Sequence, residues 1–281
     1  MFITTKENLV QHLKNDLGLE KNDFVFLHSG LIGLGLIEGG VDIITAAFDE
    51  VLSQGILIIP TFSYSWCKGE PFGPLKTECL DMGTYASQAW KDERFVRSSN
   101  PNFSVAALQN RHNSEIIKRL FNTAPTCFGI GSVFDNMYRL SHTLDGYIIL
   151  LGGAHNDVIF RTTFIHYIEE KLCAPSRYLK KFTNRANNKE YVLQLVRFLT
   201  SEEYIKIRGE ATDRYNFPVK NDYTLLGKDL IKNSLIKIKP FGYSKTRVVA
   251  IKDFCDFLEK KLKDDPDYCV TKRKLDEPVI K

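Results

Sequence analysis

The sequence predicts an α/β layered fold. Two buried-type strands, "DFVFLH" (23–28) and "GILIIPTF" (55–62), enclose a glycine-rich connection and a segment with helical spacing of its apolar residues. A third apolar strand, "GYIILLGG" (146–153), is again followed by a helical pattern. Buried strands that alternate with helices are typical of a sheet covered by helices.

The elements follow in order along the chain. "MFITTKENLVQHLKND" has the pattern of an amphipathic helix, with Thr5 as its N-cap. The glycine-rich segment 29–40 leads into a helix over 41–53, and "FSVAAL" (103–108) predicts a further strand. Helices are expected over 131–140 and 162–172, with Thr162 or Thr163 capping the second.

The last third of the chain is less regular. From 177 to 208 the pattern is polar and mixed, with dispersed aromatic residues. Residues 247–265 form an amphipathic pattern that predicts a C-terminal helix. We expect residues 1–175 to form an α/β core that includes the helix over 162–172, residues 176–265 to complete the fold, and residues 266–281 to be a charged, mobile tail.

Composition excludes several classes of protein. The chain has 281 residues, 43% of them hydrophobic and 26% charged, which is ordinary for a soluble globular protein. The net charge of +4 suits an anionic small ligand or simply a near-neutral surface, and no long basic run indicates nucleic acid or a membrane surface.

Cysteine and histidine usage predicts a reduced, metal-free, cytoplasmic protein. The six cysteines are scattered and do not form the close pairs of zinc or redox sites. No signal peptide precedes the first helix pattern, and no apolar run approaches the roughly 18 residues of a membrane span.

The glycine-rich connection is the first candidate site. Its glycines separate a strand from a helix, so backbone amides and the positive end of the helix dipole can face a phosphate. The spacing excludes the dinucleotide fingerprint, because the glycine after Gly33 and Gly35 comes one residue late, and no Gly-Lys-Ser/Thr follows. A nucleotide-type ligand and a loop that needs glycines for tight turns both remain open.

A histidine and a glutamate form the second candidate site. His166 and Glu169 lie at i and i+3 of the helix pattern "TTFIHYIEE" (162–170), so they are neighbours on one face. A carboxylate that accepts from one ring nitrogen fixes the tautomer and leaves the other nitrogen free as a base. By itself the pair is equally compatible with a solvated helix face.

The order of the motifs identifies a family. The blocks are "FLHSGLIGLGLIEGG", "ILIIPTFSYS", "FVRSSNPNFSVAAL", "FGIGSVFDNMYRL", "ILLGG" and "TTFIHYIEE". Together they resemble the aminoglycoside 3-N-acetyltransferase family, also called the antibiotic N-acetyltransferase or YokD-like family, over roughly residues 5–265. The resemblance implies a CoA-dependent N-acyltransferase that acts on an amino sugar. It also implies a three-layer α/β/α fold with a central mixed sheet, distinct from the GNAT acetyltransferases.

The resemblance also implies roles for individual residues. The catalytic base falls on His166, with Glu169 as its partner. Residues 1–175 are then expected to be the CoA-binding core with the catalytic helix, and residues 176–265 to be the acceptor side. Contacts to the phosphates and pantetheine of acyl-CoA fall on His28, Ser29, Gly30, Leu31, Gly33, Thr61, Ser98 and Ser104. Contacts to the acceptor fall on Tyr64, Asn102 and Arg177. No metal is expected. Oxyanion donors are either backbone amides of residues 29–33 or the Thr61 hydroxyl.

Two positions depart from the family pattern. Asn100 stands where the family often has a histidine, and Phe160 stands where many members have an acidic residue. Asp157, in the preceding loop, is the candidate substitute for the missing carboxylate. Direct attack in a ternary complex is the expected mechanism, with a ping-pong route through Cys67 as the alternative.

The expected acceptor is the amine of a nucleotide-linked amino-dideoxy sugar from a surface-polysaccharide pathway. The segments "PTFSYSWCKGE", "NPNFSVAAL" and "PFGYSKTRVVAIKDF" are most similar to the sequences of such members. Basic clusters such as "RYLKKFTNR" suit a diphosphate group on the acceptor. The alternatives are an aminoglycoside acceptor or a non-catalytic regulator that binds CoA or a nucleotide. The identity of the acyl group stays open between acetyl and a short 3-hydroxyacyl chain. Whether the chain forms a homo-oligomer is also open.

Overall fold

A mixed seven-stranded sheet forms the centre of the molecule. The computed structural model describes residues 1–80, 82–153, 159–174, 176–196 and 219–272. The strand order is β11 (Ile236–Phe241), β12 (Ser244–Ala250), β7 (Gly146–Leu151), β2 (Phe24–Ser29), β4 (Ile56–Pro60), β6 (Val105–Leu108) and β5 (Phe95–Arg97). Strand β2 is parallel to both neighbours, β4 and β7, while the outer pairs are antiparallel.

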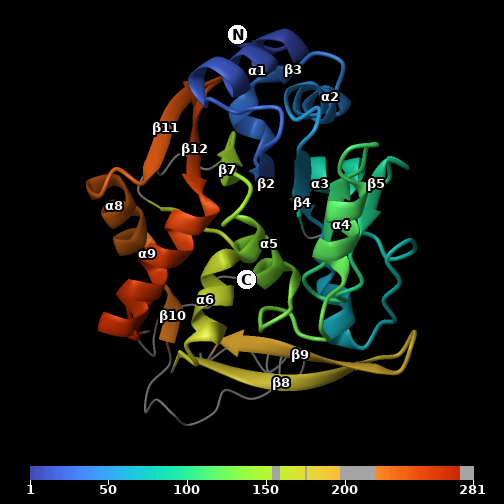
Figure 1. Cartoon of the computed structure of the whole chain (residues 1–281), viewed down its shortest axis with the longest axis vertical. Helices are drawn as coiled ribbons and strands as arrows, with labels where there is room; N and C mark the ends of the chain where they lie inside the picture. Colours follow the sequence, from blue (N-terminus) through green and yellow to red (C-terminus); the bar gives the residue numbers. More distant parts are fainter. Residues whose placement is uncertain (81, 154–158, 175, 197–218, 273–281) are drawn as a thin grey trace.

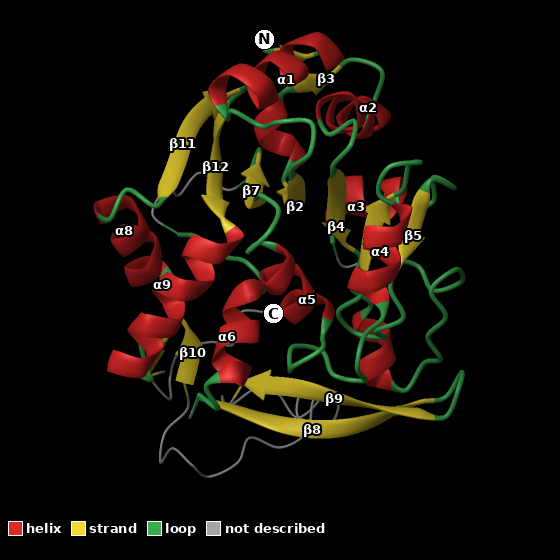
Figure 2. Cartoon of the chain, viewed as in Figure 1, coloured by secondary structure: helices red, strands yellow, loops and turns green. Residues whose placement is uncertain are grey.

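Side chains of β2 alternate between two hydrophobic cores, one on each face of the sheet. Phe24 and Phe26 lie in one core, and Val25 and Leu27 lie in the other. The first core is covered by α4 (Ser114–Phe121), α5 (Val133–Leu140), α6 (Phe164–Lys171), α8 (Thr224–Lys232) and α9 (Ile251–Asp264). The second is covered by α1 (Lys6–Gln11), η1 (His12–Asp16), α2 (Asp42–Val51) and α3 (Gly83–Ala89). Figure 2 shows α1 and α2 on one side of β2, β4 and β7, and α5 and α6 on the other. The expected three-layer α/β/α fold is confirmed.

The strands and helices with the strongest patterns lie where they are expected. Strands β2, β4, β6 and β7 and helices α2, α5 and α6 match the predicted segments within a few residues. Thr5 is the N-cap of α1: its hydroxyl accepts from the Asn8 amide at 3.2 Å, and its own amide donates to Asn8 Oδ1 at 3.0 Å.

The C-terminal prediction needs two corrections. The helix begins at Ile251, because residues 247–250 belong to β12, where they pair with β7. The charged tail does not begin at residue 266. Tyr268 and Cys269 are buried, and β13 (Val270–Lys272) pairs with β10 (Val219–Asn221). The expected two-region division stays a prediction, although strands from both regions share the central sheet.

A long hairpin was not expected from the sequence. Strands β8 (Arg177–Asn184) and β9 (Lys189–Val196) pair antiparallel and run beneath α6, outside the main sheet (Figure 1). The remaining short elements are β1 (Ile3–Thr4), paired with β3 (Leu36–Ile37), and two 3₁₀ turns, η2 (Leu31–Leu34) and η3 (Tyr64–Lys68). Within the described part of the chain, no helix has the length and apolar character needed to cross a membrane. The cytoplasmic location stays a prediction.

Candidate active site

The glycine-rich connection forms a cleft at the end of β2. The cleft has a volume of about 410 Å³ and is lined by Ser29, Gly30, Leu31, Ile32, Gly33, Gly83, Thr84, Gly152 and Gly153. It joins the loop after β2, the start of α3 and the end of β7, so the four expected loop contacts, Ser29 to Leu31 and Gly33, lie together. The carboxyl ends of parallel strands meet here, at the edge where α/β proteins bind ligands.

Glycine is required in this cleft because two loops approach each other closely. A Cβ atom at Gly30 would lie 2.9 Å from the Gly152 carbonyl oxygen. At Gly33 it would lie 2.5 Å from that oxygen and 2.6 Å from Ser244 Oγ. Gly153 differs, because a Cβ there would meet no atom of the described residues within 4 Å. Gly30 and Gly33 therefore have a packing role, and the open side of the cleft lies at Gly153.

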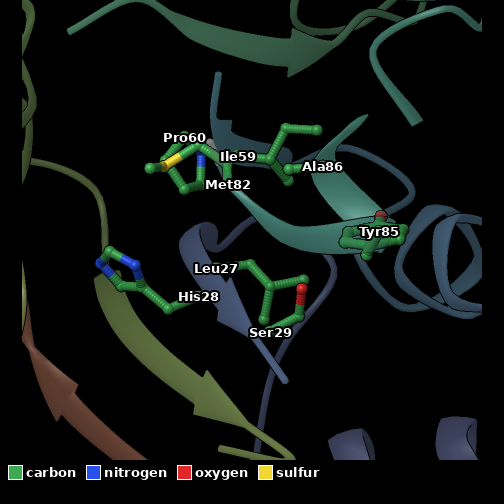
Figure 3. A pocket seen from close by; sticks show the side chains of 8 residues that line it. All are labelled: Leu27, His28, Ser29, Ile59, Pro60, Met82, Tyr85 and Ala86. Atoms are coloured by element: carbon green, nitrogen blue, oxygen red, sulfur yellow. The ribbon is translucent and has the colours of Figure 1, made fainter. Parts of the chain in front are cut away.

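His28 lies beside this cleft, at the end of β2. It lines a small pocket of about 170 Å³ together with Pro60 and Met82, and its imidazole points away from Tyr85, which lies on the other side of β2 (Figure 3). Burial, aided by the positive charge of Arg161, lowers the pKa of His28 to about 4. His28 is therefore neutral near pH 7 and is unsuited to ion pairing with a phosphate.

The catalytic pair predicted from the sequence is assembled on α6. His166 Nδ1 lies 3.1 Å from Glu169 Oε2. Glu169 is buried and also accepts from Arg177 Nη2, at 2.8 Å from Oε1 and 2.7 Å from Oε2. His166 is half-buried, and the Phe128 ring lies 5.3 Å from its ring. One imidazole nitrogen is thus held by a carboxylate that is itself held by a guanidinium.

Electrostatics set the charge states in this cluster. Burial opposes the charge of Glu169, but Arg177 and His166 outweigh it, so the pKa of Glu169 is lowered. Burial also lowers the pKa of His166, against the opposing effect of Glu169 and with a contribution from Arg177. The result near neutral pH is an ionised Glu169 beside a neutral His166, the state that a general base requires.

His28 is linked to the start of α6. Thr163 is the N-cap residue of α6, but no side chain caps the helix. Thr162 Oγ1 instead shares a hydrogen bond of 3.2 Å with His28 Nε2. Thr163 therefore occupies the expected N-cap position without a capping hydrogen bond, and Thr162 connects the end of β2 to the start of α6.

Three of the expected cofactor contacts lie in a buried network. The Arg97 guanidinium donates to the Thr61 carbonyl at 2.6 Å, to Ser63 Oγ at 2.7 Å and to Ser104 Oγ at 3.1 Å. The Thr61 hydroxyl donates to Ser104 Oγ, and Ser98 Oγ accepts from the Val105 amide. Because Thr61, Ser98 and Ser104 are fully buried, their described contacts are internal, and a contact with CoA stays a prediction.

The expected acceptor contacts are divided among different environments. Tyr64 is half-buried against Phe62 and Phe103, and Asn102 is fully buried. The guanidinium of Arg177 is buried on Glu169 and also donates to Asn221 Oδ1 at 3.0 Å. The structure assigns Arg177 to the catalytic pair, so its direct contact with an acceptor stays a prediction.

The two departures from the family pattern have structural roles. Asn100 Oδ1 accepts from the amides of Asn102 and Phe103, at 3.2 and 2.9 Å, and its Nδ2 donates to the Thr126 carbonyl at 3.1 Å. Phe160 is in the core against Phe254. The proposed substitute carboxylate, Asp157, lies outside the described residues.

Several site residues were not identified from the sequence. Gly152 and Gly153 line the cleft. The sequence feature that could have indicated them is the pair of glycines directly after an apolar strand. Gln194 of β9 donates to the His166 carbonyl oxygen at 2.8 Å. Glu170 lies next to Glu169 in the chain but accepts from Thr126 Oγ1 at 3.1 Å. Among the described residues, no cluster of three or more histidine, cysteine or acidic side chains could hold a metal ion.

Comparison with known protein sequences gives one family and one curated relative that agree with each other. Residues 26–263 match the family described as aminoglycoside 3-N-acetyltransferase. The chain is 29% identical over 176 residues to the SPbeta prophage-derived aminoglycoside N(3')-acetyltransferase-like protein YokD of Bacillus subtilis (strain 168). That match covers 54% of this chain and 61% of the relative.

Solved structures share the fold at low sequence identity. Aminoglycoside acetyltransferase AAC(3)-IVa, solved in complex with a gentamicin, has a TM-score of 0.70 and 20% identity, over 96% of this chain and 92% of the other. AAC-IIIb, solved as a binary complex with CoASH, has a TM-score of 0.69 and 16% identity, over 93% of this chain and 97% of the other.

Proposed function

Because the chain belongs to the aminoglycoside 3-N-acetyltransferase family, we propose that it transfers an acyl group from acyl-CoA to an amine of an aminoglycoside-type acceptor. The observation that carries the proposal is the hydrogen-bonded chain of Arg177, Glu169 and His166 on a helix that Thr162 links to His28, at the end of β2 beside the glycine-lined cleft. The cleft suits the cofactor, and the histidine suits the proton transfer.

Acyl-CoA is the proposed co-substrate, and its phosphates and pantetheine are proposed to occupy the cleft. A related structure carries CoASH. The Gly30 amide donates to the Leu151 carbonyl at 2.8 Å, so the amides of Leu31 and Ile32, at the start of the η2 turn, are the candidates for an anion. The open face at Gly153 lets a ligand approach the backbone. No metal is required by this chemistry.

The proposed reaction is direct attack of the acceptor nitrogen on the thioester. The N–C bond forms as the carbonyl π electrons move to oxygen, and His166 Nε2 takes the proton from nitrogen. The oxyanion then re-forms the carbonyl, the C–S bond breaks, and CoA leaves as a thiolate that takes up a proton. Glu169 stabilises the imidazolium, because its carboxylate already holds Nδ1.

Backbone amides of residues 29–33 are candidates for the oxyanion hole only if the phosphates of CoA bind elsewhere, because the pantetheine arm separates the phosphates from the thioester. The Thr61 hydroxyl, the other candidate, is fully buried and donates to Ser104. An oxyanion donor has to point at the reacting carbonyl before the reaction begins. The alternative ping-pong route depends on the side chain of Cys67, which lies outside the described side chains, so direct attack stays the first candidate.

A nucleotide-linked amino sugar is the second candidate acceptor. The net charge of +4 favours an anionic substrate, whereas an aminoglycoside is a polycation. Family membership favours the aminoglycoside-type acceptor, so we rank it first. Acetyl is the first candidate for the acyl group, with a short 3-hydroxyacyl chain as the alternative.

The His166→Ala variant tests the proposed role of the histidine. General-base assistance contributes typically a hundredfold to ten-thousandfold in rate, so kcat for release of CoA thiol should fall by about that factor while CoA still binds. His112→Ala, at an exposed position, is the matched control. Unchanged turnover per folded molecule, with a lower melting temperature, would show that His166 only packs the helix. Absence of thiol release by the wild type with every amine would favour a non-catalytic regulator.

A further inference from the structure

The imidazole of His166 lies against the ring of Phe128. The two ring centroids are 5.3 Å apart, and the rings are inclined at 52°. Phe128 is buried and packs in turn against the rings of Phe103, at 4.4 Å, and Phe134, at 5.3 Å. The Phe128 ring therefore limits the rotation that the imidazole would otherwise keep about its hydrogen bond to Glu169.

Phe128 belongs to a loop that a hydrogen bond fastens to α6. Thr126 Oγ1 donates to Glu170 Oε1 at 3.1 Å and accepts from the Gly129 amide at 3.0 Å. Glu170 comes four residues after His166, so the two side chains are neighbours on one face of the helix. A Cβ atom at Gly129 would lie 2.7 Å from Glu170 Oε1, so the loop backbone also packs closely on this carboxyl. The loop is thus joined to α6 one turn after the base.

Two other segments hold the same loop. The Thr126 carbonyl accepts from Asn100 Nδ2 at 3.1 Å. Val192 of β9 exchanges two backbone hydrogen bonds of 2.9 Å with residues 125 and 127. Loss of the bond to Glu170 would therefore remove a link between the loop and the catalytic helix without detaching the loop from the rest of the fold.

The Glu170 carboxyl opposes the stability of the protein at this position. Its Oε2 is buried and has no hydrogen-bond partner in the part of the chain that the structure describes. An apolar side chain would avoid that cost, but it could not accept a hydrogen bond from Thr126. A residue that costs stability beside a catalytic base is expected to serve the reaction.

We propose that Glu170 is a positioning residue for the catalytic base. Through its bond to Thr126 it holds the Phe128 ring against the imidazole, so the free ring nitrogen keeps its direction towards the acceptor amine. This inference rests on the proposed function, in which His166 takes the proton. A displacement of about 1 Å in a catalytic group costs up to about a hundredfold in rate, so the effect belongs to kcat and not to binding.

Variants of Glu170 test the proposal. Glu170→Leu removes the hydrogen bond to Thr126, and kcat per folded molecule should fall roughly ten- to hundredfold, while the Kd of CoA and the KM of the acceptor change little. Glu170→Gln keeps an oxygen that accepts from Thr126, so it should retain much more of the turnover. Glu115→Leu, at an exposed position of α4, is the control.

A double-mutant cycle tests whether the effect passes through Thr126. Thr126→Val removes the hydroxyl with little change of shape, and it should also lower kcat. Because Thr126→Val and Glu170→Leu break the same link, the double variant should lose little more than either single variant. Losses that multiply, or equal losses in Glu170→Gln and Glu170→Leu, would overturn the proposal.

NMR of the His166 ring separates this role from a general loss of stability. The ring current of Phe128 displaces the proton signals of the imidazole. Glu170→Leu should reduce this displacement, and Glu170→Gln should stay close to the wild type. Unchanged His166 signals in Glu170→Leu would overturn the proposal, even if kcat fell. If no amine is acylated, the proposed function fails, and the same signals still decide whether Glu170 positions the Phe128 ring.

Discussion

Two adjacent glutamates on α6 have different environments. Glu169 is ionised because Arg177 and His166 compensate its burial. Glu170 has one oxygen bonded to Thr126 Oγ1, while its Oε2 is buried without a hydrogen-bond partner among the described residues. Burial consequently raises the pKa of Glu170 to about 7. Although the two glutamates are adjacent in the sequence, the surroundings of Glu169 favour its ionised form and those of Glu170 favour its neutral form.

The Glu170→Gln variant should be more stable than the wild type above about pH 4.5, with the full gain reached above about pH 7. The folded-state pKa of Glu170 is raised from its ordinary value of 4.5 to about 7, so the wild type loses stability as pH rises between these two values. The gain should be on the order of 2 kcal/mol at pH 8 and should vanish near pH 4.5. Urea denaturation at pH 8, 6 and 4.5 measures it, with exposed Glu93→Gln as the control. A gain that does not depend on pH would contradict the assignment.

Sequence reasoning identified only part of the catalytic cluster. The i, i+3 spacing of His166 and Glu169 is local and can be recognised in any helical pattern. Arg177 comes eight residues after Glu169 and reaches it from a strand, so its role depends on how the hairpin docks. Thr61 and Ser104 were expected to contact CoA because of the family resemblance. Their burial around Arg97 follows from packing, which the sequence does not specify.

At the scale of elements, the hairpin β8–β9 is joined to the catalytic helix by polar contacts. Arg177 of β8 pairs with Glu169, and Gln194 of β9 donates to the His166 carbonyl. The hairpin forms its own two-stranded sheet. These contacts therefore link an element outside the main sheet to the position of the base.

The Arg177→Gln variant should lose stability by about 3–5 kcal/mol, because it leaves a buried carboxylate without its cation. Lys181→Gln, exposed on the same strand, should change stability little. The double variant Arg177→Gln with Glu169→Gln should be more stable than the single Arg177→Gln variant, since no buried charge remains. Denaturant midpoints measure all three, and a double variant as unstable as the sum of its parts would refute a direct ion-pair contribution.

The central strands were predicted and the hairpin was not, because their patterns of apolar residues differ. Strands β2, β4 and β7 are buried on both faces and read as continuous apolar runs. In the hairpin, buried Tyr191 and Leu193 alternate with half-buried and exposed positions that include several lysines, so its pattern is weak. The end of β12 was assigned to the following helix because its apolar residues continue into α9 without a polar break.

At the scale of the molecule, the cleft exists only because distant segments meet. The loop after β2, the start of α3 and the end of β7 each supply part of its lining. Ser244 of β12 packs against Gly33 from a fourth segment. A side chain at Gly33 would therefore disturb the fold as well as any bound phosphate, and it cannot test cofactor binding by itself.

Gly153 permits a cleaner test of the cofactor site. It lines the cleft, and an added Cβ atom would meet no neighbour within 4 Å in the part of the chain that the structure describes. Gly153→Asp should place a carboxylate against the phosphates of CoA and weaken binding roughly tenfold or more. Gly153→Asn has nearly the same shape without the charge, so it separates repulsion from steric exclusion. Calorimetric titration with CoA measures the Kd of both variants. Raising the salt concentration should bring the two Kd values closer together, because exposed charges are screened. If Asp and Asn weaken binding equally, the phosphates do not face Gly153, and the anionic part of CoA has to be placed elsewhere on the loop of residues 29–33.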